Sequence, residues 1–281
     1  MVPGAEPEYI AARTVLLDAL EALDSQRDAI IVVGAQAVYL RTGHAGITGV
    51  APYTTDADLA LAPARLADKP LIETLLGDAG FEQKGAPGVW WKRVDMAGEP
   101  TAVEVDIMVP ERYAPAGGRR SVRLPPHDKM VARKAIGLEG SMIDHDLIDI
   151  VALDDSDARR FTIRVAGPAA LVVAKVYKLR DRLREGKADR IADKDAADVY
   201  RLMLSVSVSE FLLRLRPMLA DETAGSVCSE AVDLMAQMFG ARLADGVRMA
   251  IDALRIAVRP ETVADVCNGF VRHVLEGLEG S

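Results

Sequence analysis

The chain has 281 residues and a formal net charge of −8 at pH 7, with 50% hydrophobic and 27% charged residues. This composition is typical of a folded globular protein and excludes a disordered, collagen-like or low-complexity chain. The acidic balance argues against a general nucleic-acid coat, although a local basic face could still hold RNA.

Neither a membrane segment nor a disulfide-rich fold is expected. No stretch approaches the roughly 18 uninterrupted apolar residues that a membrane helix needs, and the first ten residues lack the pattern of a secretion signal. Cys228 and Cys267 are too few for a disulfide framework or a cysteine zinc site, and the four histidines are scattered. We therefore expect a cytoplasmic protein.

The first part of the chain alternates between helical and extended patterns. Apolar spacings of three and four predict helices, whereas short apolar or alternating runs bounded by turn residues predict strands. We expect helices over residues 8–24, 37–40, 63–79 and 127–137, and strands or extended segments over 29–33, 56–61, 89–96, 101–109, 120–124, 147–153 and 161–165. The strands 89–96 and 101–109 are expected to form a hairpin around the turn at residues 98–100.

From Pro168 onward every segment has helical spacing, and this proline suits a first helical turn. Helices are expected over residues 168–185, 190–204, 207–220, 226–238, 241–257 and 260–277. We therefore expect a boundary near Gly167, with an α/β domain over residues 1–167 and an all-helical domain over 168–281.

Two predicted strands carry pairs of acidic side chains. Alternate residues of a strand share a face, so Asp56 and Asp58 point to one side of their strand, and Glu104 and Asp106 to one side of theirs. Neighbouring carboxylates repel unless a cation lies between them, and Mg²⁺ prefers oxygen ligands. If the strands are adjacent, Asp56, Asp58 and Asp106 can converge on two metal ions, as in displacement at phosphorus. The alternative is that these acids solvate an exposed sheet face.

A glycine turn precedes these strands. Gly34 ends the apolar run 29–33 and begins a predicted helix, so the backbone there can approach a ligand and offer N–H groups to phosphate. It belongs to neither a dinucleotide fingerprint nor a Walker loop. A plain structural connector is the more common reason for such a turn.

The helical region begins with a basic helix. Lys175 and Arg182 flank its apolar stripe, with Lys178 slightly further round. Such side chains can direct their charges into a cleft or form a solvated flank. In the next helix Asp195 projects into the apolar stripe, so it needs a partner, for which Lys175 or Arg182 is the natural candidate. A structural salt bridge between two helices explains this pattern as well.

Four motifs occur in order over roughly residues 29–203: the Gly34 turn, Thr55-Asp56-Ala57-Asp58, Val105-Asp106, and Lys175 followed by Lys194-Asp195-Ala196-Ala197-Asp198. Together they resemble the DNA-polymerase-β-like nucleotidyltransferase superfamily, and most closely its AbiEii/MenT branch of bacterial toxins. The resemblance implies an α/β nucleotidyltransferase fold, with a mixed sheet flanked by helices and a helical C-terminal domain. The chain departs from the family at Ala35, where the family has serine or glycine.

The resemblance also implies an activity, the transfer of a nucleoside monophosphate from an NTP to a hydroxyl group at the 3′ end of tRNA. It implies Mg²⁺ or Mn²⁺ as the cofactor, and an antitoxin protein as the partner in a toxin–antitoxin system. The candidate catalytic residues are Asp56, Asp58, Asp106, Lys175 and Asp195, the candidate metal ligands are Asp56, Asp58 and Asp106, and the candidate nucleotide-binding residues are Gly34, Ala35, Thr55, Lys175, Lys178 and Arg182.

Other functions stay open. Seven basic residues against one acid lie between Arg112 and Lys134, and this island could bind an RNA backbone, line the nucleotide pocket or promote solubility. The acceptor could be a small molecule such as an antibiotic. Ala35 favours a catalytically inactive module that binds a nucleotide or a partner. A glycosyltransferase with an Asp-x-Asp motif is a remote further alternative.

Overall fold

The computed structural model describes residues 7–43, 53–96, 99–116, 120–185 and 190–280. The chain folds into two compact units. The first is built from Met1–Ala37, Ala51–Ala135 and His145–Ala166, and the second from Val38–Val50, Ile136–Asp144 and Gly167–Ser281. The second unit therefore contains the helical region together with two short segments from earlier in the chain.

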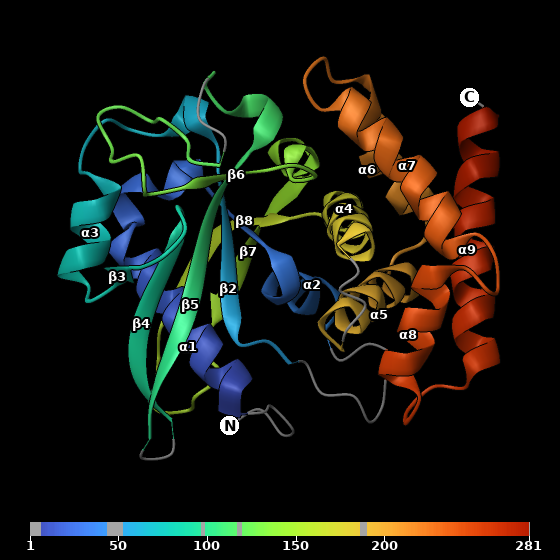
Figure 1. Ribbon diagram of the computed structural model, residues 1–281, viewed down its shortest axis with the longest axis horizontal. Helices are drawn as coiled ribbons and strands as arrows, with labels where there is room; N and C mark the ends of the chain where they lie inside the picture. Colours follow the sequence, from blue (N-terminus) through green and yellow to red (C-terminus); the bar gives the residue numbers. More distant parts are fainter. Residues whose placement is uncertain (1–6, 44–52, 97–98, 117–119, 186–189, 281) are drawn as a thin grey trace. The chain divides into compact units, whose positions relative to one another are not determined.

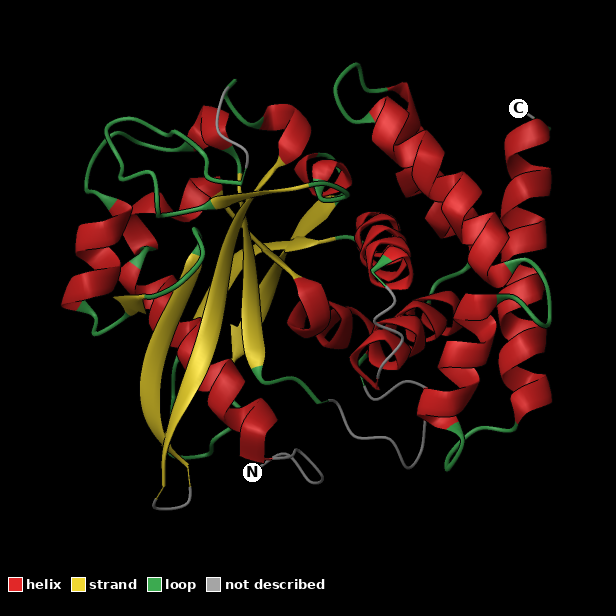
Figure 2. Ribbon diagram, viewed as in Figure 1, coloured by secondary structure: helices red, strands yellow, loops and turns green. Residues whose placement is uncertain are grey.

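A mixed sheet of eight strands, among the residues described, forms the centre of the first unit (Figures 1 and 2). The strands are β1 (Ile30–Val33), β2 (Asp56–Leu61), β3 (Glu82–Gln83), β4 (Val89–Met96), β5 (Glu99–Pro110), β6 (Arg133–Ala135), β7 (His145–Val151) and β8 (Arg160–Ala166). Their order is β3-β4-β5-β2-β1-β8-β7, and β6 pairs with β5. The β2–β5, β1–β8 and β5–β6 pairs are parallel, and the others are antiparallel.

One face of this sheet is apolar and covered by a helix. Ala57, Leu59 and Val105 are completely buried, and α1 (Pro7–Ala22) contacts β2, β4, β5 and β8 (Figure 1). Two further helices, α2 (Gly34–Thr42) and α3 (Ile72–Asp78), follow β1 and β2 in the chain. Because every second residue of β2 and β5 faces α1, their intervening acids must face the other side.

Six α-helices lie in the described residues from Pro168 onward, and each corresponds to a segment predicted to be helical. They are α4 (Pro168–Arg184), α5 (Arg190–Ser205), α6 (Val208–Ala220), α7 (Gly225–Phe239), α8 (Asp245–Leu254) and α9 (Pro260–Glu279). Cys228 and Cys267 are buried free thiols, and burial raises the pKa of each to about 12. These cysteines therefore act as small core residues.

The expected fold class is confirmed: a mixed sheet is flanked by helices and followed by a helical region. The expected hairpin is confirmed as β4 and β5, although Gly98 lies outside the described residues. None of the helices in the described part of the chain has the length and apolar character that crossing a membrane requires.

Three local predictions were wrong. The helix expected over 63–79 is only α3 with a separate 3₁₀ turn at Pro63–Arg65, because Pro70 lacks an N–H group and disfavours helix before it. The strand expected over 120–124 is a single bridge from Ser121 to Arg133. The helix expected over 127–137 is replaced by turns and by β6, whose backbone hydrogen bonds go to β5.

Candidate active site on the acidic face of the sheet

The two acidic strands lie side by side. β2 and β5 are parallel, and their register pairs Asp56 with Glu104 and Asp58 with Asp106. Directly paired residues of neighbouring strands point to the same face, so four carboxyl groups gather on the face away from α1. Asp106 is buried, and the other three are half-buried. The fold thus concentrates negative charge at one place on the sheet.

The Gly34 turn lies against this acidic face. In the antiparallel pair of β1 and β2, Val33 is opposite Asp58. Gly34 has a φ of 68°, and a Cβ atom added to it would lie 1.9 Å from Oδ2 of Asp58. Only glycine allows both the positive φ and this close approach. Ala35, in the first turn of α2, is buried, so any phosphate contact there would come from backbone N–H groups.

Asp56 is oriented by residues that the motif analysis did not include. The hydroxyl of Thr54, which is completely buried, donates a hydrogen bond to Oδ1 of Asp56. Gln36 Nε2 donates to the Asp56 carbonyl at 3.3 Å, and Arg13 fixes Gln36 by donating to its Oε1 at 2.7 Å. Thr55 is exposed. The strand alternation contains the missed signal, because residue 54 has the same phase as residues 56 and 58.

Asp106 is held by an arginine. Nε of Arg133 lies 2.9 and 3.1 Å from the two carboxylate oxygens of Asp106, and its Nη2 also donates to Oδ2. Burial alone lowers the pKa of the guanidinium, but the hydrogen bonds and charge of Asp106 outweigh this effect, so the pKa is raised. The sequence analysis counted Arg133 only as part of a basic island, because nothing local to residue 133 indicates its partner.

Glu104 resists ionisation more than a free glutamate side chain does. Its pKa is raised, first by burial and then by the negative charges of Asp106 and Asp56, whereas Arg133 acts in the opposite direction. It shares a face with Asp106, as the alternation predicted, but it was not among the candidate site residues. Glu104 therefore keeps its proton to a higher pH than a free glutamate does.

The side chains of this face do not form a ready metal site. Within the described residues, no group of three or more histidine, cysteine, aspartate or glutamate side chains is arranged to hold a metal ion. The donors are the hard oxygen ligands that Mg²⁺ prefers, but both oxygens of Asp106 are engaged by Arg133 and Oδ1 of Asp56 by Thr54. The residue types are those that bind a divalent cation, but Arg133 lies where the cation would contact Asp106.

The second unit has its own charged cluster. Lys175 is 3% exposed, and its ammonium group donates to Asp195 at 2.6 Å and to Asp198 at 2.7 Å. Burial lowers the pKa of this lysine, but the two carboxylates outweigh burial and raise it. The expected pairing between the first two helices of this region is therefore present, and Lys175 is enclosed by it.

Asp195 also pairs with two further cations, which are more accessible than Lys175. Nζ of Lys178 lies 3.6 Å from Oδ1 of Asp195, and Nη2 of Arg182 lies 3.2 Å from its Oδ2. The Lys178 side chain is 45% exposed. Burial raises the pKa of Asp195, but the positive charges of Lys175, Lys178 and Arg182 outweigh burial and lower the pKa to about 2. Asp195 therefore holds one buried cation and two outer ones.

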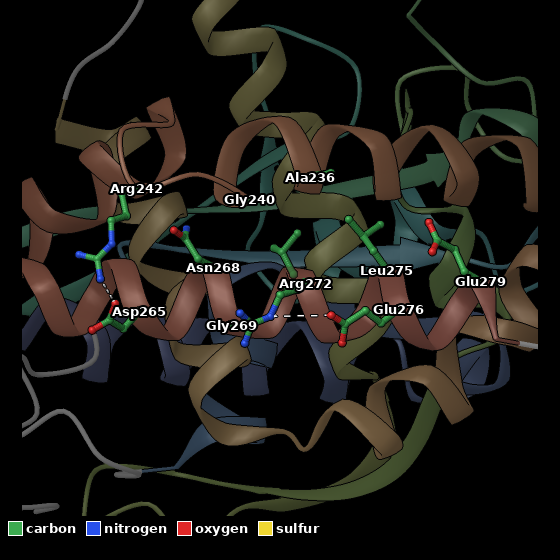
Figure 3. Close-up of a pocket in the computed structure, with 11 residues that line it drawn as sticks. Ala236, Gly240, Arg242, Asp265, Asn268, Gly269, Arg272, Leu275, Glu276 and Glu279 are labelled. Atoms are coloured by element: carbon green, nitrogen blue, oxygen red, sulfur yellow. Dashed lines mark hydrogen bonds and ion pairs between the residues drawn. The ribbon is translucent and has the colours of Figure 1, made fainter.

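A hollow of about 770 Å³ lies along α7 and α9 in the second unit (Figure 3). Arg242 pairs with Asp265 across it, and Arg272 lies 3.9 Å from Glu276. The close-up shows these charged groups directed toward one another. The hollow carries none of the candidate site residues, so it does not help to identify the chemistry.

Comparison with known proteins shows a family. The chain matches a family model described as nucleotidyltransferase over residues 12–214. The matched stretch includes β1 through α5, and with them the acidic face and the cluster around Lys175. No curated protein and no solved structure matches the chain.

Proposed function

The chain belongs to a nucleotidyltransferase family, and from this membership we propose that it transfers a nucleoside monophosphate from an NTP to a hydroxyl group in a metal-dependent reaction. We propose the 3′ end of tRNA as the acceptor, and a toxin role with a cognate antitoxin protein. The observation that supports the proposal best is the register of β2 and β5, which gathers four carboxyl groups beside the Gly34 turn.

Asp56, Asp58 and Asp106 are the residues that would hold Mg²⁺ or Mn²⁺. The cation, when bound, neutralises the triphosphate and lowers the pKa of the acceptor hydroxyl. Thr54 keeps the Asp56 carboxylate oriented through its hydroxyl. Glu104, whose pKa is raised, is suited to take up a proton on this face.

The triphosphate requires positive charge and N–H donors. The α2 N-terminus supplies backbone donors after Gly34, and the missing hydroxyl at Ala35 is not needed for such contacts. Among the basic residues proposed for nucleotide binding on α4, Lys178 and Arg182 are better suited than Lys175, because Lys175 is buried and doubly paired. Lys175 then acts through Asp195, which positions both outer cations.

The basic island of the first unit supports an RNA acceptor. Four of its residues are exposed: Arg112, Arg120, Arg123 and Lys129. Exposed arginines and lysines hold RNA through its phosphates, without reading its sequence. Arg119 belongs to the same island in the sequence but lies outside the described residues. A small-molecule acceptor such as an antibiotic would not need this charge.

One observation favours a second candidate function, a catalytically inactive module that binds a nucleotide or a partner. Arg133 already occupies Asp106, and the described acidic side chains form no metal site. Together with Ala35, this arrangement is compatible with binding in the absence of turnover. The two candidates differ in whether pyrophosphate is released.

The test is incubation of the purified protein with each α-labelled NTP, Mg²⁺ and total tRNA. We expect label on RNA and release of pyrophosphate, and loss of both in Asp58→Asn. Asp149→Asn is the matched control, because Asp149 is an exposed strand aspartate of the same sheet. Label on a small hydroxyl compound alone would support the other acceptor class. NTP binding without turnover would support the inactive module.

A further inference from the structure

Arg133 is held on the acidic face by the fold around it. β6 pairs with β5 so that Arg133 is opposite Met108, which has the same strand phase as Glu104 and Asp106. Residues before it are clamped, because Gly88 N–H donates to the Met130 carbonyl at 2.9 Å. The backbone position of Arg133 is therefore determined independently of its salt bridge.

Two more contacts fix this segment. The indole N–H of Trp90 donates to the Val131 carbonyl at 3.1 Å. Gly88 has a φ of 81°, and a Cβ atom added there would lie 2.4 Å from the Ile107 carbonyl oxygen, 2.8 Å from the Arg133 backbone nitrogen and 3.1 Å from the Arg133 Cγ. The chain passes so close to Arg133 that only glycine fits.

The guanidinium neutralises more than its direct partner. It binds both oxygens of Asp106 and is also under the influence of the charges of Asp58 and Glu104. Like charges gathered on one face destabilise the fold unless a cation is near. On this face the guanidinium of Arg133 is such a cation, supplied by the chain itself. The hydrogen bonds from Arg133 to Asp106 use the same carboxylate oxygens that a divalent cation would need.

We propose that Arg133 is an internal counter-ion that a divalent cation must displace from Asp106. This inference rests on the proposed function, because it concerns the ion of that same site. Displacement requires only rotation of the Arg133 side chain, since its backbone is clamped. A freed guanidinium has a planar set of donors suited to phosphate oxygens. A triphosphate therefore assists the release, and the cation and the nucleotide bind cooperatively.

The test is titration with Mn²⁺, followed by the loss of the free-ion electron paramagnetic resonance signal. We expect Arg133→Gln to bind Mn²⁺ about ten- to a hundredfold more tightly than the wild type, the factor set by a charge-assisted hydrogen-bond pair. Arg133→Lys should lie between them. A non-hydrolysable NTP analogue should tighten Mn²⁺ binding in the wild type and have less effect in Arg133→Gln.

Arg160→Gln is the matched control, because Arg160 also pairs with a strand aspartate, Asp149, in the same sheet. It should leave Mn²⁺ affinity unchanged. In an Asp106→Asn background, Arg133→Gln should give no gain, and this pair of variants also tests whether an altered fold explains the effect. Equal Mn²⁺ affinity in wild type and Arg133→Gln, or no binding by either, would overturn the inference. Nucleotide transfer by the wild type is measured separately, so failure of the proposed function would be seen on its own.

Discussion

Replacement of Gly34 by alanine tests the geometry on which the site depends. Two features of Gly34 resist a side chain: its φ of 68°, and the Oδ2 atom of Asp58, 1.9 Å from where the Cβ would lie. The carboxylate can rotate away from the methyl group, but the Cβ atom of Asp58, 2.8 Å from the same point, moves only if the strand shifts slightly. The variant should therefore fold, with Asp58 forced away from its present position.

The size of the effect follows from these two contributions. An alanine in the left-handed region costs about 1–2 kcal/mol, and displacement of packed atoms typically costs about 1–3 kcal/mol more. We expect Gly34→Ala to lower the free energy of unfolding by about 2–5 kcal/mol. Gly80→Ala is the matched control, since Gly80 has a φ of 81° but nothing within 4 Å of its added Cβ. It should show only the backbone contribution.

The assay is urea unfolding of both variants under identical conditions, repeated in an Asp58→Ala background. In that background the cost of Gly34→Ala should fall but stay above that of Gly80→Ala, because the carboxylate is gone while the Cβ atom of residue 58 would still lie 2.8 Å from the added methyl group. Equal losses in Gly34→Ala and Gly80→Ala with Asp58 intact would refute the reasoning. Gly34 would then be needed only for its backbone conformation, and its closeness to the acidic face would carry no weight.

Three further substitutions test the electrostatics. Lys175→Met removes the buried cation that Asp195 and Asp198 share, and leaves Asp195 only its two outer cations. It should cost about 3–5 kcal/mol of unfolding free energy. A loss below about 1 kcal/mol in urea unfolding would contradict the burial of this cluster. Glu104→Gln should stabilise the protein at pH 7 and have little effect at pH 4. The reason is that the pKa of Glu104 is raised in the folded state. The protonated side chain therefore contributes stability below the pKa of the unfolded state, and this stability is lost as the pH rises through the pKa of the folded state. An equal shift of the urea midpoint at both pH values would contradict this reasoning. Thr54→Val removes the hydroxyl donor to Asp56 and should cost about 1 kcal/mol, whereas Thr54→Ser should retain most of the stability.

The local patterns of the chain predicted much of this architecture. Alternation along a strand is a property of the strand itself, so Asp56 and Asp58 could be assigned to one face without tertiary information. Helical spacing likewise predicted the helices of the C-terminal region. The predictions at 63–79 and 120–137 failed where prolines and nonlocal backbone pairing override short-range patterns.

The partners across the sheet could not be read from the chain. The pairing of Asp58 with Asp106 depends on the parallel register of β2 and β5, whose paired residues lie 48 positions apart in the sequence.

 A register is set by the contacts of the folded sheet, and a shift of one residue would turn the carboxyl groups to the opposite face.

The partners of two basic residues of the candidate site, Lys175 and Arg133, also could not be predicted from the sequence alone. Lys175 has the spacing of a helix-edge residue, but its burial follows from the packing of α4 against α5. Arg133 is indistinguishable from its basic neighbours in the sequence, and only the pairing of β6 with β5 brings it to Asp106. The chain alone therefore determined which residue types alternate on each strand and helix, because those periods are local. Which charges meet was settled by long-range pairing and burial, because an ion pair forms between residues that folding brings together.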